Sequence, residues 1–365
     1  MIRFAVGRLL ALLGLMAALV VVVFLLQGIS GIDVARAQLG PTASEDLVET
    51  RRQELGYDDP VLTRLVRYGS DVLSGDFGTS TRTGSPVRDD IAESLPASIE
   101  LIGAIMVVAV AAALALAIVS VGHGRAGHAA RIAVSVGASA PAFLVALLAL
   151  VIFYRNLRWF PATGRTSLDS APVGPTGLLT VDSLLSGNLQ AFFDAVWHLV
   201  LPATAAALAP ACVIARILRG SLIAELDKDY VDVARMKGLS HRQVLVRHCL
   251  GNAAGPALSM SGLIVAGLFA GSLIVEQLVA WPGLGNYAYR SIQASDFTAI
   301  AGITLTIGAI YLLVNTTVEL VQRHIDPRIG SASNAGRPNN LLRRLPELPT
   351  STRRFGQSAP RDAVD

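Results

Sequence analysis

The chain has 365 residues, of which 52% are hydrophobic and 16% are charged, with a formal net charge of +3 at pH 7. Ordinary soluble domains carry roughly 25% charged residues, so this composition excludes a typical soluble domain and predicts a membrane protein. The small basic excess is explained by membrane topology rather than by nucleic-acid binding.

Six apolar runs are long enough to be membrane spans. Hydrocarbon leaves backbone N–H and C=O groups without water partners, and runs of about 20 apolar residues therefore indicate helices. Two of the six are less uniform, because the fourth contains two prolines and an arginine and the fifth contains a glutamate. In chain order they are 9–32, 96–121, 132–153, 198–218, 256–279 and 299–318. The predicted fold class is an all-α membrane protein with six transmembrane helices.

The first run has two interpretations. Arg3 and Arg8 precede it, and Ala35-Arg36-Ala37 resembles the small-x-small site of a cleaved signal peptide. The run exceeds the roughly 7 to 15 apolar residues of a signal peptide, so a retained helix is favoured.

Basic residues in the short loops orient the spans. The loop 121–132 contains two arginines, two histidines and no acid, which is typical of a cytoplasmic loop. Counting outward from it places both termini in the cytoplasm. It places 30–95 outside, where twelve acids outnumber seven arginines, and returns 219–255 to the cytoplasm.

The chain is expected to divide into four parts. They are a first transmembrane helix at 1–29, an external domain at 30–95, a five-helix core at 96–330 and a disordered cytoplasmic tail at 331–365.

Three further expectations concern the external loops and the cysteines. The external domain is predicted to hold two short helices, at 44–55 and 60–73, whereas the second external loop, 155–194, is rich in Gly, Pro, Ser and Thr and is predicted to be mostly irregular. Cys212 and Cys249 lie at different predicted depths and suggest no disulfide.

A charged stretch, DYVDVARMKGLSHRQVLVRHCL at 229–250, separates the fourth and fifth runs. Apolar residues at spacing three, namely Tyr230, Val233 and Met236, predict a first amphipathic helix. Gly238 stands where that helix ends, because glycine tolerates the left-handed conformation of a C-terminal cap. The sequence from Ser240 to Gln243 matches a capping box, with Leu239 and Val244 as a hydrophobic staple. The stretch therefore predicts a helix, a tight turn and a second helix.

This hairpin has two possible roles. Small side chains at Ala234 and Gly238 would let another protein approach its backbone, and its charged residues would orient that partner. Alternatively, it is an interfacial hairpin that lies on lipid headgroups. The acids across 225–232 argue against close contact with anionic lipid, but the residues alone leave both roles open.

The stretch resembles the cytoplasmic EAA loop of binding-protein-dependent ABC import permeases. Asp232, Val233, Ala234 and Gly238 stand where that family has Glu, Ala, Ala and Gly. Four further segments resemble the first permease subunit of dipeptide, oligopeptide and nickel importers, and the similarity covers about residues 1 to 330. These segments are LGYDDPVLTRLVRYGSDVLSGDFGTS (55–80), PVRDDIAESLPASIELIGA (86–104), EQLVAWPGLGNYAYRSIQASDF (276–297) and DPRIG (326–330).

The chain departs from the family's pattern at three places. Asp232 is shorter than the family's glutamate but keeps a carboxylate that pairs with a cation. His248 and Gly251 stand where the general EAA pattern has Ile and Pro, although Pro256 stands where peptide permeases tend to have their proline.

The resemblance implies a permease subunit in the bacterial cytoplasmic membrane. Its expected partners are a second homologous permease, two ATP-binding subunits and an external substrate-binding protein, and its expected cargo is dipeptides or oligopeptides, with nickel or haem as the alternative. The chain has no Gly-x-x-x-x-Gly-Lys-Ser/Thr loop, and its only lysines are Lys228 and Lys237. We therefore expect ATP and magnesium to be used by the partners, and no cofactor or metal to be held here.

Three sets of candidate site residues follow. The residues predicted to couple to the ATPases belong to the loop 225–250: Asp232, Val233, Ala234, Arg235, Gly238, Leu239 and Ser240. Those predicted to dock the binding protein or form a gate are Gly75, Asp76, Gly78, Trp281, Pro282 and Gly283. Polar residues at membrane depth are candidates for the transport pathway, namely Glu276, Gln277 and Asn315.

Several of these residues have simpler structural interpretations. Trp281 is equally well explained as a membrane-interface anchor. Glu100 is expected in the first turn of a helix that opens at Pro96, where the helix dipole favours a carboxylate. The glycines of GLFAG at 267–271 indicate a close-packing face, either toward a second permease or within the chain.

Two other classes of protein share this composition, a polytopic membrane enzyme and an ATP-independent channel. The sequence contains no His-Glu-x-x-His and no Gly-x-Ser-x-Gly, and His198 and His248 are interpreted as isolated structural residues. Co-purification with a Walker-motif ATPase would separate an importer from a channel.

Overall fold

The structure is a computed structural model that describes residues 2–29, 34–39, 42–54, 56, 58–169, 172 and 174–325. Within these residues the regular elements are all helices, and β-structure is limited to one isolated bridge between Thr79 and Pro86. The predicted tail at 331–365 and the DPRIG segment lie outside the described residues.

Five helical stretches of the described chain are long and apolar enough to cross a membrane, and a bent pair makes a sixth candidate. The five are α1 (Ile2–Ile29), α5 (Val87–Val121), α9 (Leu189–Leu226), α15 (Phe297–Ile325) and the continuous run of α11 (His241–Val244), η2 (Leu245–Cys249) and α12 (Leu250–Gly271). The bent pair is α6 (Arg125–Gly137) followed by α7 (Ala142–Ala149) and η1 (Leu150–Asn156). The prediction of an all-α membrane protein is confirmed.

The third span is not the straight helix expected at 132–153. The chain direction bends by 108° between its two parts. The break falls at Pro141, which precedes the first residue of α7. Proline has no N–H to donate and disfavours helical backbone in the residue before it, so α6 ends and a new helix begins.

The second span begins earlier than expected. Helix α5 starts at Val87 and contains Pro96 in its interior, so Glu100 lies well inside the helix and the explanation by a first-turn dipole is wrong. The true first turn carries Asp89 and Asp90, whose carboxylates the helix N-terminus favours. Burial of Val87 and Ile91 against the residues of α14 and α15 holds this added length in place.

The fifth span also has different limits from those expected at 256–279. The helix begins at His241 and α12 ends at Gly271, and after a break at Ser272 a separate helix, α13 (Leu273–Leu278), follows.

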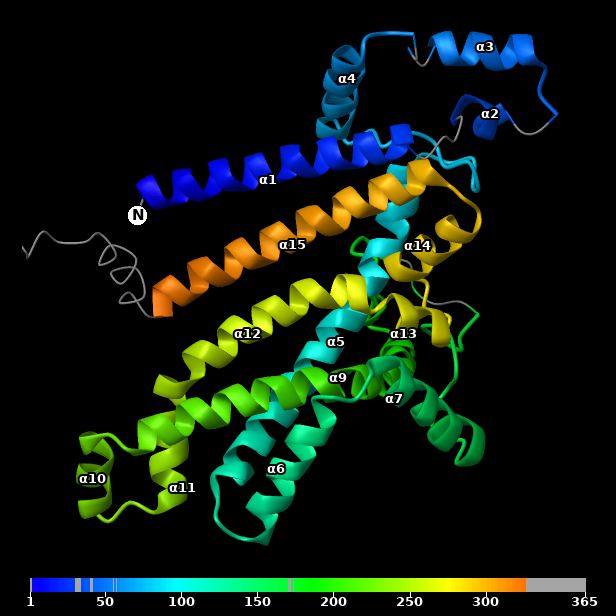
Figure 1. The fold of residues 1–365 in the computed structure, drawn as a ribbon. Helices are drawn as coiled ribbons and strands as arrows, with labels where there is room; N and C mark the ends of the chain where they lie inside the picture. Colours follow the sequence, from blue (N-terminus) through cyan, green and yellow to red (C-terminus); the bar gives the residue numbers. More distant parts are fainter. Residues whose placement is uncertain are drawn as a thin grey trace, which may run out of the picture.

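The spans pack in a definite order (Figure 1). Helix α9 lies along α5, α12 lies against both α15 and α9, and α1 lies against α15. Glycines permit two of these contacts: a Cβ at Gly308 would stand 2.3 Å from Leu19 of α1, and one at Gly262 would stand 2.1 Å from Val318 of α15. At Gly267 and Gly271, by contrast, a Cβ would meet no described atom within 4 Å, so this glycine face does not pack within the described chain.

Shorter helices occupy the connections. The two expected in the first loop are α3 (Glu45–Glu54) and α4 (Val61–Leu73), and α2 (Val34–Leu39) was not expected. The second loop is less irregular than expected, because α8 (Leu179–Leu185) lies within it and α9 already begins at Leu189. The side chain of Asn188 caps α9 by accepting from the N–H of Ala191. Helix α14 (Leu284–Gln293) precedes the last span.

The bundle has two distinct ends (Figure 1). The helical hairpin made by α10 (Asp229–Met236) and α11 lies at one end, together with the beginning of α1 and the end of α15. We call this the hairpin end. Helices α13 and α14 lie at the opposite end, which we call the α14 end.

Candidate functional site

The turn at the hairpin end has the predicted geometry. Gly238 has a φ of +83°, a left-handed conformation that L side chains rarely adopt, and its N–H donates to the carbonyl of Arg235 at 2.9 Å. The capping box is also confirmed, because the side chain of Ser240 accepts from the N–H of Gln243 and the Gln243 side chain accepts from the N–H of Ser240 at 2.9 Å. Both helices of the hairpin are therefore terminated by local hydrogen bonds.

A shared apolar core joins the hairpin to its flanking spans. Val231 and Ala234 of α10 are buried in one cluster with residues of α9, α11, η2 and α12, including Leu218, Leu222, Val244, Leu245, Cys249 and Ala253. Cys212 belongs to the same cluster, and both cysteines are free thiols, as expected. A hairpin that shares a core with two spans is constrained to move with them.

Tyr230 adds a polar connection between the same elements. Its hydroxyl donates to Oε2 of Glu225 on α9 at 2.7 Å and accepts from Nδ2 of Asn252 on α12 at 3.5 Å. Burial raises the pKa of Tyr230 to about 12; the hydrogen bond to Glu225 adds to this effect and that from Asn252 opposes it, so the phenol keeps the proton that it donates.

The orientation of α10 differs from the one that the sequence predicts. Val233 and Met236 were assigned to its apolar face and Ala234 to an approach surface, but Ala234 is buried and Met236 is 80% exposed. The contacts of Val231 and Ala234 with α9 and α12 decide which face points inward, and these contacts cannot be seen in the local spacing. Of the predicted coupling residues, Leu239 is partly buried and the others apart from Ala234 are exposed, namely Asp232, Val233, Arg235, Gly238 and Ser240. Met236 and Lys237 beside them are exposed too.

Glu276 organises the α14 end. It is fully buried, and its Oε1 accepts from the hydroxyl of Ser98 at 2.7 Å and from that of Ser272 at 3.1 Å. Its Oε2 accepts from the N–H of Asn286 at 3.1 Å. A Cβ at Gly283 would stand 2.4 Å from this Oε2, so Gly283 is required for close approach to the carboxylate.

Trp281 is part of the core at this end. Only 1% of it is exposed, and its indole N–H donates to the carbonyl of Ala97 at 2.8 Å. This burial rules out the interpretation as a membrane-interface anchor, since such an anchor reaches the headgroups. Pro282, next to it, is exposed.

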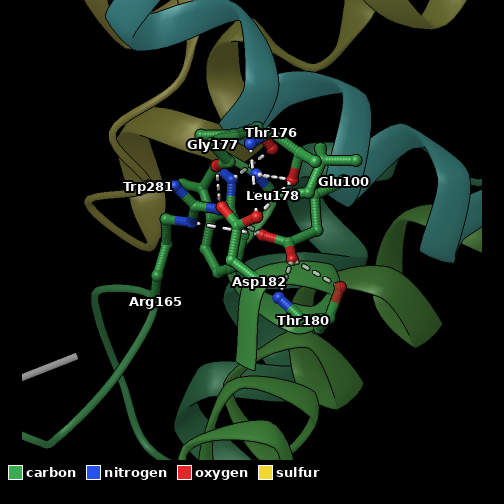
Figure 2. Close-up of polar contacts among 9 residues, drawn as sticks. Glu100, Arg165, Thr176, Gly177, Leu178, Thr180, Asp182 and Trp281 are labelled. Carbon is green, nitrogen blue, oxygen red and sulfur yellow. Dashed lines mark hydrogen bonds and ion pairs between the residues drawn. The ribbon is translucent and has the colours of Figure 1, made fainter. Parts of the chain in front are cut away.

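Glu100 fixes the second loop to α5 (Figure 2). The side chain is 5% exposed, and its Oε2 lies 2.6 Å from Nη2 of Arg165. Its Oε1 accepts from both the N–H and the hydroxyl of Thr180, at 2.6 and 2.7 Å. The arginine also donates to the carbonyl of Gly177 at 3.0 Å and lies 5.9 Å from the Trp281 ring. Sequence reasoning missed Arg165 and Thr180, because Arg165 is one of three arginines in the loop and no local pattern distinguishes it.

Asp296 was also missed. It is fully buried, its Oδ2 accepts from the hydroxyl of Ser80 at 2.5 Å and from the N–H of Arg82 at 3.2 Å, and its Oδ1 accepts from the N–H of Ala299 at 3.1 Å. It therefore caps α15 and holds the segment that leads into α5.

The remaining predicted site residues are dispersed. Gly75, Asp76 and Gly78 form the turn after α4, where Oδ1 of Asp76 accepts from the N–H of Gly78 at 2.9 Å. Gln277 is exposed, and Asn315 is half-buried about 27 Å along α15 from its first residue at 1.5 Å per residue. The described contacts of Glu276 include neither of them, so the three pathway candidates do not form one cluster.

The metal-ligating residue types form no metal centre in the part of the chain that the structure describes. The described residues contain no group of three or more His, Cys, Asp or Glu arranged to hold a metal ion. His198 is not isolated, because its Nδ1 lies 2.8 Å from the carbonyl of Asp194 and its Nε2 lies 3.1 Å from the Ser167 hydroxyl. These contacts tie the second loop to α9.

A cleft of about 340 Å³ opens at the α14 end. Charged and polar residues of α5, α14 and the two long connections line it, including Arg82, Asp90, Glu93, Arg165, Asn286 and Arg290.

A bundle of apolar helices, with an exposed hairpin that shares a core with two spans, defines a polytopic membrane protein. The family model described as binding-protein-dependent transport system inner membrane component matches residues 105–331, and the corresponding N-terminal model matches residues 1–102. The chain belongs to this family of inner-membrane transport components.

Individual relatives support the assignment. The chain is 37% identical over 318 residues to the probable D,D-dipeptide transport system permease protein DdpB of Escherichia coli K12, covering 86% of this chain and 93% of the relative. It is 32% identical over 331 residues to the dipeptide transport system permease protein DppB of Alkalihalophilus pseudofirmus, covering 90% and 99%. It is 31% identical over 324 residues to the probable peptide ABC transporter permease protein y4tP of Sinorhizobium fredii, covering 88% and 97%.

Proposed function

We propose that this chain is the transmembrane permease subunit of an ATP-driven importer of dipeptides or oligopeptides. The three relatives described above are named for dipeptide or peptide transport, which supports a peptide cargo over nickel or haem. The proposed complex contains a second homologous permease, two ATP-binding subunits and an external substrate-binding protein. ATP and magnesium act in the ATP-binding subunits, since this chain has no phosphate-binding loop.

The connection of the hairpin to its flanking spans is the observation that carries the proposal. Asp232, Val233 and Met236 are available to a partner, whereas Val231 and Ala234 lock the same short helix into the core shared by α9 and α12. When the ATP-binding subunits close, a displacement of the hairpin is passed to both spans as a rigid-body movement. This geometry favours a protein partner over a hairpin that merely lies on headgroups, because a lipid surface needs no rigid connection.

We assign the hairpin end to the cytoplasm and the α14 end to the external face. The basic loop 121–132 supports this orientation. The hairpin, the start of α1 and the end of α15 lie at the same end of the bundle (Figure 1). With the hairpin inside, both ends of the described chain lie inside as well. Exposed Pro282 and the turn at Gly75 to Gly78 then face the external side, where the binding protein docks.

Reconstitution tests this function. The chain, together with the subunits encoded by neighbouring genes, is placed in liposomes, and uptake of labelled dipeptides and the ATPase rate are measured with and without the binding protein. Peptide uptake that requires ATP and the binding protein is the expected result. Stimulation by nickel or haem alone would contradict the peptide assignment.

Crosslinking tests the role of the hairpin. In the variant Met236→Cys, crosslinks are sought in native vesicles. The control at the opposite end is Ile292→Cys, which replaces an exposed residue of α14. The hairpin variant is expected to crosslink to an ATP-binding subunit and the control is not. No such crosslink from the hairpin in native vesicles would overturn the coupling role.

A further inference from the structure

The cleft at the α14 end has the size and position of a small-molecule site. Its volume of about 340 Å³ falls at the lower end of the roughly 300 to 1,000 Å³ typical of ligand pockets. Its walls come from α5, from α14, from the turn containing Pro282 and Gly283, and from the second loop. Hydrogen bonds of Glu276 and Glu100 hold these elements together.

Two of the charged residues in the cleft are engaged by other parts of the chain. Arg165 is paired with Glu100. Oδ2 of Asp90 accepts from the hydroxyl of Thr83 at 2.7 Å and from that of Tyr287 at 3.0 Å. Burial and the neighbouring Asp90 carboxylate raise the pKa of Tyr287, so its hydroxyl remains a donor to Asp90.

Other polar groups in the cleft have no such partner within the described chain. Arg290 and Glu93 are both exposed, and the side chain of neither makes an ion pair or hydrogen bond within the described chain. The guanidinium of Arg82 lies 5.5 Å from the Tyr287 ring, which leaves its N–H donors available. Asn286 is 5% exposed, its Nδ2 donates to the carbonyl of Trp281, and its buried Oδ1 has no hydrogen-bond partner among the described residues.

We propose that this cleft binds the charged ends of a short peptide, with the carboxylate at Arg290 and Arg82 and the ammonium at Glu93. Arginine presents a planar fork of donors that matches a carboxylate, and a glutamate accepts from an ammonium group. A free dipeptide carries both charges in one small molecule, which a cleft with unpaired residues of both signs suits better than an anion or a cation would.

This inference rests on the proposed peptide function and adds to it a site on the permease itself. Because the cleft lies at the end assigned to the external face, it would receive peptide on release from the binding protein. A site that recognises the two termini does not contact the side chains of the peptide, which fits a carrier of peptides of varied sequence.

Direct binding to the permease complex tests the site. The complex of this chain with its second permease and ATP-binding subunits is placed in nanodiscs without binding protein. Binding of radiolabelled L-alanyl-L-alanine and D-alanyl-D-alanine is measured, with N-acetylated and C-amidated forms as competitors. Saturable binding is expected, and loss of either terminal charge should weaken it about ten- to a hundredfold, the range for hydrogen bonds to charged groups.

Substitutions then assign each terminus. Glu93→Gln should abolish the penalty for N-acetylation and leave the penalty for amidation, whereas Arg290→Gln should do the reverse and Arg290→Lys should keep part of the affinity. Asp89→Asn and Arg88→Gln are the matched controls, because these exposed residues of α5 pair with each other at 3.4 Å and do not line the cleft. Both controls should bind like the unmodified complex.

Three results would overturn the inference. They are a lack of saturable dipeptide binding, variants with unchanged penalties, and variants that weaken only the binding protein's association, which would make the cleft a docking surface. Peptide uptake without peptide binding at the cleft would contradict this inference alone. Absence of peptide uptake in the full system would contradict the proposed function, whereas terminus-dependent binding in nanodiscs would still establish the site.

Discussion

The two ends of the bundle are held together by different kinds of interaction. At the hairpin end, α10 is fixed mainly by buried apolar side chains, and its charged residues are exposed. At the α14 end, the buried carboxylates Glu100, Glu276 and Asp296 hold the connecting segments in place. Apolar burial therefore fixes the hairpin and leaves its charged groups accessible, whereas buried carboxylates fix the long connections by hydrogen bonds.

The difference predicts opposite effects of substitution. A buried carboxylate is tolerated only while its hydrogen bonds are made, so replacing one at the α14 end should lower stability. Replacing an exposed residue of the hairpin should change transport and leave stability nearly unchanged, because exposed ion pairs contribute little.

The largest expected effect is loss of uptake in Gly238→Glu. A side chain at a φ of +83° strains the turn, and the added charged side chain occupies the exposed face of the hairpin. Peptide uptake in reconstituted liposomes should be abolished while membrane insertion stays intact. Gly187→Glu is the matched control, because Gly187 has a φ of +70° and also meets no atom within 4 Å of a built Cβ. Normal ATP-coupled uptake by Gly238→Glu would count against the coupling role.

Arg165→Ala should cause the largest loss of stability. It leaves the buried carboxylate of Glu100 without its cation, and breaking a buried pair in this way costs about 3 to 5 kcal/mol. Thermal unfolding in detergent measures the change, with exposed Arg155→Ala as the control. Adding Glu100→Gln should recover part of the loss, and additive effects of the two substitutions would show that the pair is not coupled.

Glu276→Gln should have an intermediate effect. The amide keeps one acceptor but cannot match the carboxylate bonds to Ser98, Ser272 and Asn286, and hydrogen bonds to a charged group contribute about 1.5 to 3 kcal/mol each. A lower unfolding temperature is therefore expected, with exposed Gln277→Ala as the neutral neighbour. Unchanged stability combined with lost uptake would instead return Glu276 to the transport pathway.

Asp232→Asn should have the smallest effect on stability. Its exposed pair with Arg235 at 3.3 Å contributes at most about 1 kcal/mol. Uptake should nevertheless fall, and Asp232→Glu should retain it because a carboxylate remains. Asp89→Asn, which alters an exposed pair at the other end, should leave uptake unchanged. A fall in unfolding temperature for Asp232→Asn as large as that for Arg165→Ala would erase the distinction between the two ends.

Much of the fold was predictable because it depends on local signals. Apolar runs of membrane length located the spans, and the capping box with Gly238 located the hairpin turn. The start of α5 was predicted too late and the break at Pro141 was not predicted. An apolar run shows where hydrocarbon is favoured but not where a helix begins or bends.

The sequence by itself determined the membrane class, the family resemblance and the helix-turn-helix, since each is written in residues close together along the chain. The tertiary structure alone decided which face of α10 is buried and which groups meet Glu100 and Glu276. The Ser98 and Glu276 side chains are 178 positions apart, and those of Glu100 and Arg165 are 65 apart. Pairs so distant are brought together by the packing of whole helices, and local periodicity carries no information about that packing.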